Sequence, residues 1–274
     1  MSDVITIARL EFTGVARLKW IRLLAAAFAL LSLAAAYSAG AASELSGADG
    51  FARTTMTLIP VALILIPLAA VVLGVAGQSA ESGSEPFLFA QPISRAAVLV
   101  GRWLGEWTAL GSAIACGFGI GALVVASGAV IAGAGSFVLF TAAAIVLAGI
   151  FLSIGATIAA ATEKRLAALG AATFVWFVFV LLYDAVALSV AGWVTGSIGG
   201  RILFVSVFGN PADLIRIAML RLAGTAHVLG AAGDAWTRFL GGDAMAASIA
   251  AAALGAWVAG PLAIGVLVLR ARDL

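Results

Sequence analysis

The sequence has little charge, one cysteine (Cys116) and one histidine (His227). Charged residues make up 10% of the 274, against roughly 25% in ordinary soluble domains. Mean hydropathy is +1.17 and 64% of the residues are hydrophobic, which excludes a water-soluble globular fold. A single cysteine and a single histidine exclude a disulfide framework and a cluster of Cys and His metal ligands.

Sequence motifs for catalysis and nucleotide binding are also missing. The chain has no G-x-x-x-x-G-K-[ST] phosphate loop, no G-x-S-x-G nucleophile turn and no H-E-x-x-H zinc motif. The surplus of two basic residues is too small to indicate a nucleic acid partner. We therefore expect no catalytic residues, cofactor or metal ion in this chain.

Long apolar runs are present instead, and each is long enough to cross a membrane as a helix of about 20 residues. The runs lack the alternation of barrel strands, so the sequence predicts an all-α polytopic membrane protein. The expected spans are residues 21–42, 54–76, 107–128, 136–161, 166–191 and 244–269. The charged stretch before the first span does not look like a cleavable signal peptide, so that span should be retained.

Six spans place both termini on one side of the membrane. That side carries ten basic residues, namely Arg9, Arg17, Lys19, Arg22, Arg95, Arg102, Lys164, Arg165, Arg270 and Arg272. The opposite side carries five, four of them in the long connection 192–243. The positive-inside rule therefore predicts an inner-membrane protein with both termini in the cytoplasm.

Residues 4–20 show a helical pattern before the first span. Ile5, Ala8, Phe12 and Val15 share one face, and the opposite face carries Thr6, Arg9, Thr13 and Arg17. This pattern predicts an amphipathic helix on the cytoplasmic leaflet; the alternative is a solvated basic flank of the first span.

The cytoplasmic connection 78–106 mixes acidic and small residues with apolar ones. It contains, in order, Glu81, Gly83, Ser84, Glu85, Phe87, Leu88, Phe89, Pro92 and Arg95. A simple tether would not need the apolar triplet 87–89, so we expect this connection to bind another protein.

The external connection 192–243 contains a helix start. Asn210 is an N-cap residue, Pro211 suits the first helical position, and Asp213 places an acid in the first turn. The helix that follows, to Leu222, is too short to span and apolar on nearly every side. We expect it to lie in the outer interface, with its two arginines reaching toward the lipid headgroups, or to cover another subunit.

Asp184 is the only carboxylate well inside a predicted span, which makes it a candidate functional residue. The alternatives are a structural hydrogen bond to a neighbouring helix, or a position nearer the surface. We expect its partner to be a hydroxyl or a backbone group. Close helix contacts are expected at small-residue pairs such as Gly101 with Gly105, Gly117 with Gly121 and Gly192 with Gly196.

Three short segments follow one another in a recognisable order. They are Glu81-Ser82-Gly83-Ser84, then Pro92-Ile93-Ser94-Arg95, then Gly101-Arg102. This order and spacing resembles the signature of type-2 ABC transporter permeases. The resemblance implies a coupling helix around residues 81–89 that docks on a separate ATPase subunit, and that subunit would bind ATP and magnesium. Pro86 departs from the family pattern, so this helix is expected to be short or to begin later.

Further resemblances extend over nearly the whole chain. Arg9, Glu11 and Arg17 look like part of the family's connecting helix. Residues 175–180 with Asp184, and the segment from Asn210 to Asp213 with Arg216, resemble the branch that serves copper-site maturation of nitrous oxide reductase. That branch implies a periplasmic β-helical partner on the external helices, for which we expect contact residues Asn210, Pro211, Asp213, Arg216 and Met219.

The sequence therefore predicts the membrane subunit of an ATP-driven transporter, most simply a homodimer with two ATPase subunits. One alternative within the family is an exporter of a lipid or a hydrophobic small molecule. Outside it, the alternatives are an integral membrane enzyme using Asp184 and a stand-alone secondary transporter. The last would usually show an internal repeat, and none is evident.

Overall fold

The computed structural model describes residues 2–41, 48–78, 94–126, 133–193, 197–222 and 242–271, and every element in these ranges is a helix. Six of the described helices are long and apolar enough to cross a membrane. The helices α9 and α10 pass the same test only as a pair, and that pair is bent by 103°. The predicted all-α fold with six membrane-crossing helices is confirmed.

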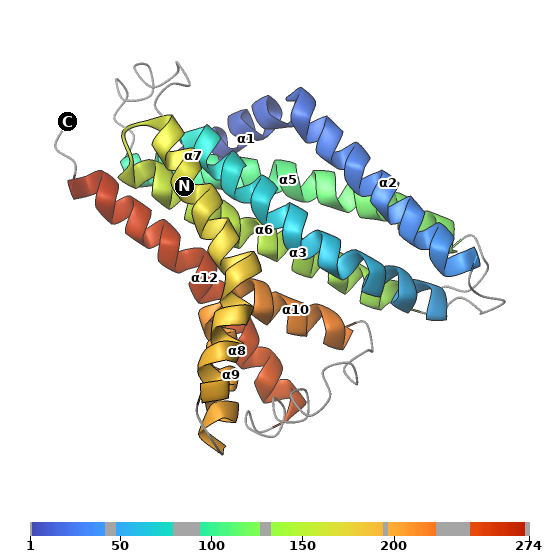
Figure 1. Ribbon diagram of the computed structural model, residues 1–274. Helices are drawn as coiled ribbons and strands as arrows, with labels where there is room; N and C mark the ends of the chain where they lie inside the picture. Colours follow the sequence, from blue (N-terminus) through green and yellow to red (C-terminus); the bar gives the residue numbers. More distant parts are fainter. Residues whose placement is uncertain are drawn as a thin grey trace.

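Figure 1 shows the described helices in the order of the chain. In chain order they are α1 Ser2–Ala16, α2 Lys19–Ala41, α3 Ala48–Gln78, α5 Arg95–Ala126, α6 Ala134–Ala161, α7 Arg165–Phe177, the π-helical turn η2 Val178–Leu182, α8 Tyr183–Trp193, α9 Ser197–Gly209, α10 Pro211–Leu222 and α12 Asp243–Ala271. Each expected span overlaps one long helix, with the fifth formed by α7, η2 and α8 together. The helix of the third span, α5, starts at Arg95 and so begins earlier than expected, because residues 95–106 continue the same helix.

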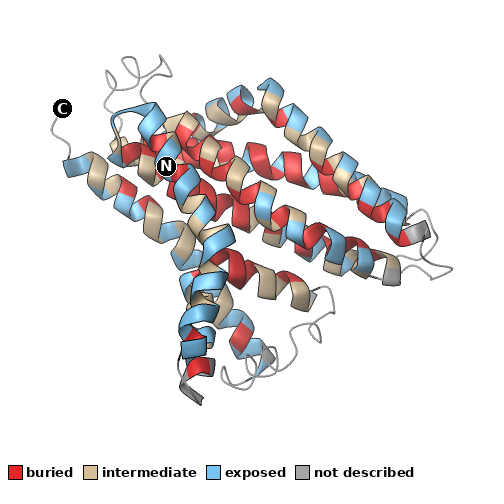
Figure 2. Cartoon of the chain, viewed as in Figure 1, coloured by how far each residue is buried: buried red, intermediate tan, exposed pale blue. Residues whose placement is uncertain are grey.

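The core of the bundle lies where α6 packs along α3 and α5 (Figure 2). Gly74 on α3 and Gly155 on α6 let the two backbones approach closely: a Cβ atom at Gly74 would collide with the Leu152 carbonyl, and one at Gly155 with the Val71 carbonyl. Small residues allow such contacts between membrane helices, where packing provides much of the attraction.

Two of the predicted glycine pairs do lie at close helix contacts on α5. Gly117 and Gly121 face α2, where added Cβ atoms would meet Phe28 and Ser32. Gly101 and Gly105 face α1. Gly192 has open space around it, and its predicted companion at position 196 lies outside the described residues.

The N-terminal helix α1 ends at Ala16, before the predicted end at residue 20, and packs along α5. Its buried positions are Ile7 and Val15, while Ile5 is 63% exposed. The side of α1 that packs on the bundle is set by contact with Gly101 and Gly105, which leaves Ile5 of the predicted apolar face exposed. Arg9 and Arg17 are exposed, as a polar face requires.

The fifth and sixth spans lie at the outside of the bundle, and much of their apolar surface is exposed (Figure 2). In the most apolar 18-residue stretch of each of these two spans, 11% is buried, against 67% in α6. Pro261 cannot donate to the carbonyl of Trp257 within α12, and this carbonyl lies 3.5 Å from the Ser153 hydroxyl of α6. The indole of Trp176 donates to the Ile64 carbonyl of α3 at 3.2 Å, which holds the fifth span to the core.

One end of the bundle carries both the beginning of α1 and the end of α12 (Figure 1). The guanidinium of Arg95, in the first turn of α5, donates to the Leu269 carbonyl at 2.8 Å. A Cβ atom at Gly101 would touch Ile7 and the Val4 carbonyl of α1. We call this the terminal end, and the region of α8, α9 and α10 the distal end.

Candidate functional site

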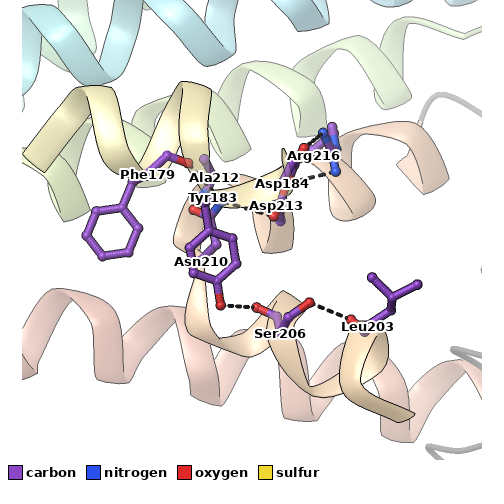
Figure 3. A network of polar contacts seen from close by, with 9 residues as sticks. All are labelled: Phe179, Tyr183, Asp184, Leu203, Ser206, Asn210, Ala212, Asp213 and Arg216. Carbon is purple, nitrogen blue, oxygen red and sulfur yellow. Dashed lines mark hydrogen bonds and ion pairs between the residues drawn. The ribbon is translucent and has the colours of Figure 1, made fainter. Parts of the chain in front are cut away.

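Three charged side chains meet at the distal end, between α8 and α10 (Figure 3). Arg216 Nη1 lies 2.7 Å from Asp184 Oδ2, and Arg216 Nη2 lies 2.8 Å from Asp213 Oδ1. The Asp213 side chain is 9% exposed, whereas those of Asp184 and Arg216 are 49% and 41% exposed. The described partner of Asp184 is therefore a charged group, and not the hydroxyl or backbone group expected from the sequence.

Asn210 fixes the start of α10 at the predicted residue. Its Oδ1 accepts a hydrogen bond of 3.0 Å from the Ala212 amide, which is the N-cap interaction. Its Nδ2 donates to Asp213 Oδ2 and to the Phe179 carbonyl, each at 2.9 Å. One buried side chain thus caps α10, orients Asp213 and connects the helix to the fifth span.

The carbonyl that Asn210 contacts belongs to the π-helical turn Val178–Leu182. In this turn the Tyr183 amide donates to Val178, five residues back, and not to Phe179. Such single π turns are often found at functional sites. The turn allows the Phe179 carbonyl to accept from Asn210, so the local helix geometry and the contact with α10 depend on each other.

Aromatic side chains satisfy the last carbonyl groups of α9. The last carbonyl groups of an α-helix generally lack a partner within the helix, and a buried carbonyl without a partner is costly. The Tyr183 hydroxyl donates to the Ser206 carbonyl at 2.8 Å, and the Trp257 indole donates to the Phe208 carbonyl at 3.0 Å. The bend between α9 and α10 is therefore held by side chains of both the fifth and the sixth span.

The charge balance of this site is uneven, with two carboxylates around one guanidinium. Burial, together with the hydrogen bond to Asp184, raises the pKa of Asp213 to about 7, although Arg216 acts in the opposite direction. At neutral pH Asp213 is therefore close to the midpoint of its titration. Protonation would leave one carboxylate for one guanidinium, so the charge of the site depends on pH.

The structure distinguishes the residues that were expected to contact a periplasmic partner. Asn210, Pro211, Asp213 and Met219 are buried within the chain, whereas Arg216 is accessible. Tyr183, Phe179 and Trp257 were not predicted as site residues. The ring centroid of Phe179 lies 6.2 Å from that of Tyr183 in the same span and 5.6 Å from that of Trp257, so the second contact joins the fifth span to the sixth.

At the terminal end, most of the predicted coupling residues lie outside the described residues. These are Glu81, Gly83, Phe87, Leu88, Phe89 and Pro92. Gln78 precedes the undescribed segment, and its Nε2 donates to the Leu99 carbonyl at 3.4 Å. On α1, burial raises the pKa of Glu11, and Arg102 partly opposes that rise.

No group of three or more His, Cys, Asp or Glu side chains within the described ranges is placed to hold a metal ion. The arrangement at the distal end is instead a polar connection between helices. It joins the fifth and sixth spans to α9 and α10.

Six helices that are long and apolar enough to cross a membrane define a multi-pass membrane protein. Over residues 5–274 the chain matches the ABC-2 family transporter protein, and it belongs to this family. It is similar to the probable ABC transporter permease protein NosY of Pseudomonas aeruginosa, with 30% identity over 229 residues, or 80% of this chain and 82% of the relative. The protein of the same description from Stutzerimonas stutzeri is 28% identical over 227 residues, with the same coverage.

The chain is therefore the membrane permease subunit of an ABC-2 transporter, without an ATPase domain. Family membership implies an ATPase partner. Membership of this family decides against the two alternatives from outside it, a membrane enzyme using Asp184 and a secondary transporter.

Proposed function

We propose that this permease converts ATP hydrolysis in a separate subunit into movement of α9 and α10, which act on a periplasmic protein. In the finer form of the proposal, the permease is NosY-like and contributes to copper-site maturation of nitrous oxide reductase. The observation that carries the proposal is the fastening of the α9–α10 bend to the fifth span through Asn210 and Arg216. The similarity to two NosY permeases supports the finer form.

The orientation follows from charge. Because basic residues are in excess at the terminal end, we place that end in the cytoplasm and the distal end at the periplasmic face. ATP and magnesium would then bind to an ATPase on the cytoplasmic side of the membrane, next to the terminal end. A second copy of this chain would complete the transporter, and lipid would cover the remaining apolar surface.

The ATPase would dock on the cytoplasmic segment 81–89. Phe87, Leu88 and Phe89 are proposed as buried anchors, with Glu81 and Arg95 at the polar rim, because apolar anchors within a polar rim dominate protein interfaces. Gly83 and Pro92 are the other residues that we propose for this docking segment. Exposed Arg9 and Arg17 on α1 lie at the same end of the bundle as Arg95.

Movement would reach the distal end through packed helices. The docking segment 81–89 lies between α3 and α5 in the sequence. Both of these helices pack on α6, and α6 in turn packs on α10. On α10 the side chains of Leu214, Ile215 and Met219 are almost fully buried. A shift of the core would therefore displace α10 directly, while the contacts from Asn210, Tyr183 and Trp257 keep α9 in register with it.

Site-specific cross-linking tests the proposal. In a chain with Cys116 replaced by serine, single cysteines at Arg216 and at Val205, which is 65% exposed on α9, would carry a photoactivated reagent in native membranes. We expect both to trap a periplasmic protein, with a yield that changes when ATP is hydrolysed. A cysteine at fully buried Met219 is the matched control and should trap none. Trapping of lipid or of the permease alone would contradict the proposal.

A second candidate function is export of a lipid or a hydrophobic small molecule. The extensive exposed apolar surface of the fifth and sixth spans favours it, with Leu166 84% and Trp193 87% exposed. ATP-dependent movement of a labelled lipid across vesicles that contain only the permease and its ATPase would identify this function. No movement without a periplasmic partner would favour the first proposal.

A further inference from the structure

A fully buried carboxyl group at the terminal end has no part in the proposed function. Glu106 on α5 is 0% exposed, and neither of its side-chain oxygens has a hydrogen-bond partner among the described residues. The group packs against Gly77 in the last turn of α3, where a Cβ atom would collide with Glu106 Oε1. Glycine at position 77 therefore makes room for this side chain.

Few charged groups of the described residues face Glu106. Arg102, one turn earlier in α5, is 5% exposed and donates from Nη1 to the Gly77 carbonyl at 3.2 Å. Glu11 of α1 packs against the neighbouring position of α5, where a Cβ atom at Gly105 would collide with the Glu11 Cβ atom. The sequence of α3 has no ionisable residue after Arg53, and that of α6 has none. Two carboxyl groups thus surround one guanidinium that also serves a backbone carbonyl.

An ionised carboxylate without hydrogen bonds costs several kcal/mol in a protein interior, whereas a neutral carboxyl group costs far less. Repulsion from Glu11 increases the cost of ionisation, and no described cation other than Arg102 offsets it. We infer that Glu106 is a proton-binding site, which holds its proton while α1 and the end of α3 are packed on α5.

The site lies where a conformational change would reach it first. Gln78, bonded to the Leu99 carbonyl, and Arg95 lie close to the two ends of the cytoplasmic segment 79–93. Gly101 and Gly105 bring α1 against the same part of α5. Separation of α3 or α1 from α5 would admit water, break the O–H bond of the carboxyl group and release the proton to the cytoplasm. Repacking would take up one proton again.

Infrared spectroscopy of the purified full chain in lipid nanodiscs tests the inference, because the C=O band of a protonated carboxyl group is absent from a carboxylate. At neutral pH, Glu106→Gln should remove one such band. Glu163→Gln is the matched control and should remove none, because Glu163 is exposed. Glu11→Gln should also leave the Glu106 band in place. An unchanged band in Glu106→Gln would overturn the inference.

A second measurement needs no variant. Wild-type protein labelled with ¹³C-glutamate should show an isotope-shifted carboxylic acid band, which separates it from any aspartic acid band. Absence of a shifted band at neutral pH would overturn the inference even if Glu106→Gln failed to fold. Because the measurement uses the permease alone, its outcome is independent of the proposed ATPase coupling and periplasmic partner.

Discussion

Asn210 Nδ2 donates to the carbonyl of Phe179 at 2.9 Å, from the start of α10 to the π turn of the fifth span. These residues are 31 positions apart, and the bond is made at the one place where the helix departs from α geometry. The link makes the position of α10 depend on the conformation of a membrane-spanning helix.

Replacement of Asn210 should separate its two roles. Asn210→Asp keeps an oxygen that can cap α10 but loses the donor to Phe179 and places a second carboxylate beside Asp213. Asn210→Ala loses both, and loss of the cap alone costs about 1 kcal/mol. We expect thermal unfolding in detergent to show lower stability for both variants. Unchanged unfolding midpoints for both would contradict the role of Asn210.

The ion pairs of Arg216 should be unequal in energy. The pair with Asp184 is half-exposed, so Asp184→Asn should cost less than about 1 kcal/mol. Arg216→Gln should cost more, about 1–3 kcal/mol, because it leaves the buried Asp213 carboxyl without its cationic partner. Denaturant unfolding of the single and double variants measures both energies. If transport-linked function survives Asp184→Asn and Asp184→Leu, Asp184 has no functional role.

Stability should depend on pH through Asp213. Its pKa rises from an ordinary value of 3.8 to about 7 in the folded protein, so the folded state binds more protons between these values. The free energy of unfolding should therefore fall as pH rises from about 4 through 7. Asp213→Asn should flatten this part of the curve. A wild-type curve that rises over the same interval would contradict the assignment.

The close contact of α3 with α6 gives a prediction about packing. Gly155→Ala would place a Cβ atom against the Val71 carbonyl and should cost about 1–3 kcal/mol. Gly170→Ala is the matched control: nothing lies within 4 Å of the added atom, and alanine favours helix by about 0.5–1 kcal/mol. Thermal unfolding of both variants should show opposite shifts.

Docking of the ATPase is tested by changing Phe87 and Leu88 together to aspartate. The double variant should release the ATPase from the purified complex, because two charges would occupy the proposed apolar anchor positions. The permease should still be folded by circular dichroism. Retention of the ATPase would exclude this segment as the docking site.

The sequence predicted the features that depend on local composition. Long apolar runs predicted six spans, and the order Asn210, Pro211, Asp213 predicted the start of α10. The partner of Asp184 was not predicted, because the spacing of 32 residues to Arg216 has no local signature. For a related reason, periodicity defined the apolar face of α1, but packing on the bundle decides which of its residues, such as Val15, are buried in the protein. Glu106 was not predicted as a site residue because it adjoins the end of a predicted span, where charged residues are common.

The π turn in the fifth span also sets the rotational phase of everything that follows it. An α-helix advances by about 100° per residue, so one residue accommodated in a wider turn changes the direction in which α8 faces. Closing Val178–Leu182 to regular α geometry without removing a residue would rotate Asp184 by about that angle, away from Arg216. The wider turn is thus what aligns Asp184 on a membrane-spanning helix with Arg216 on α10.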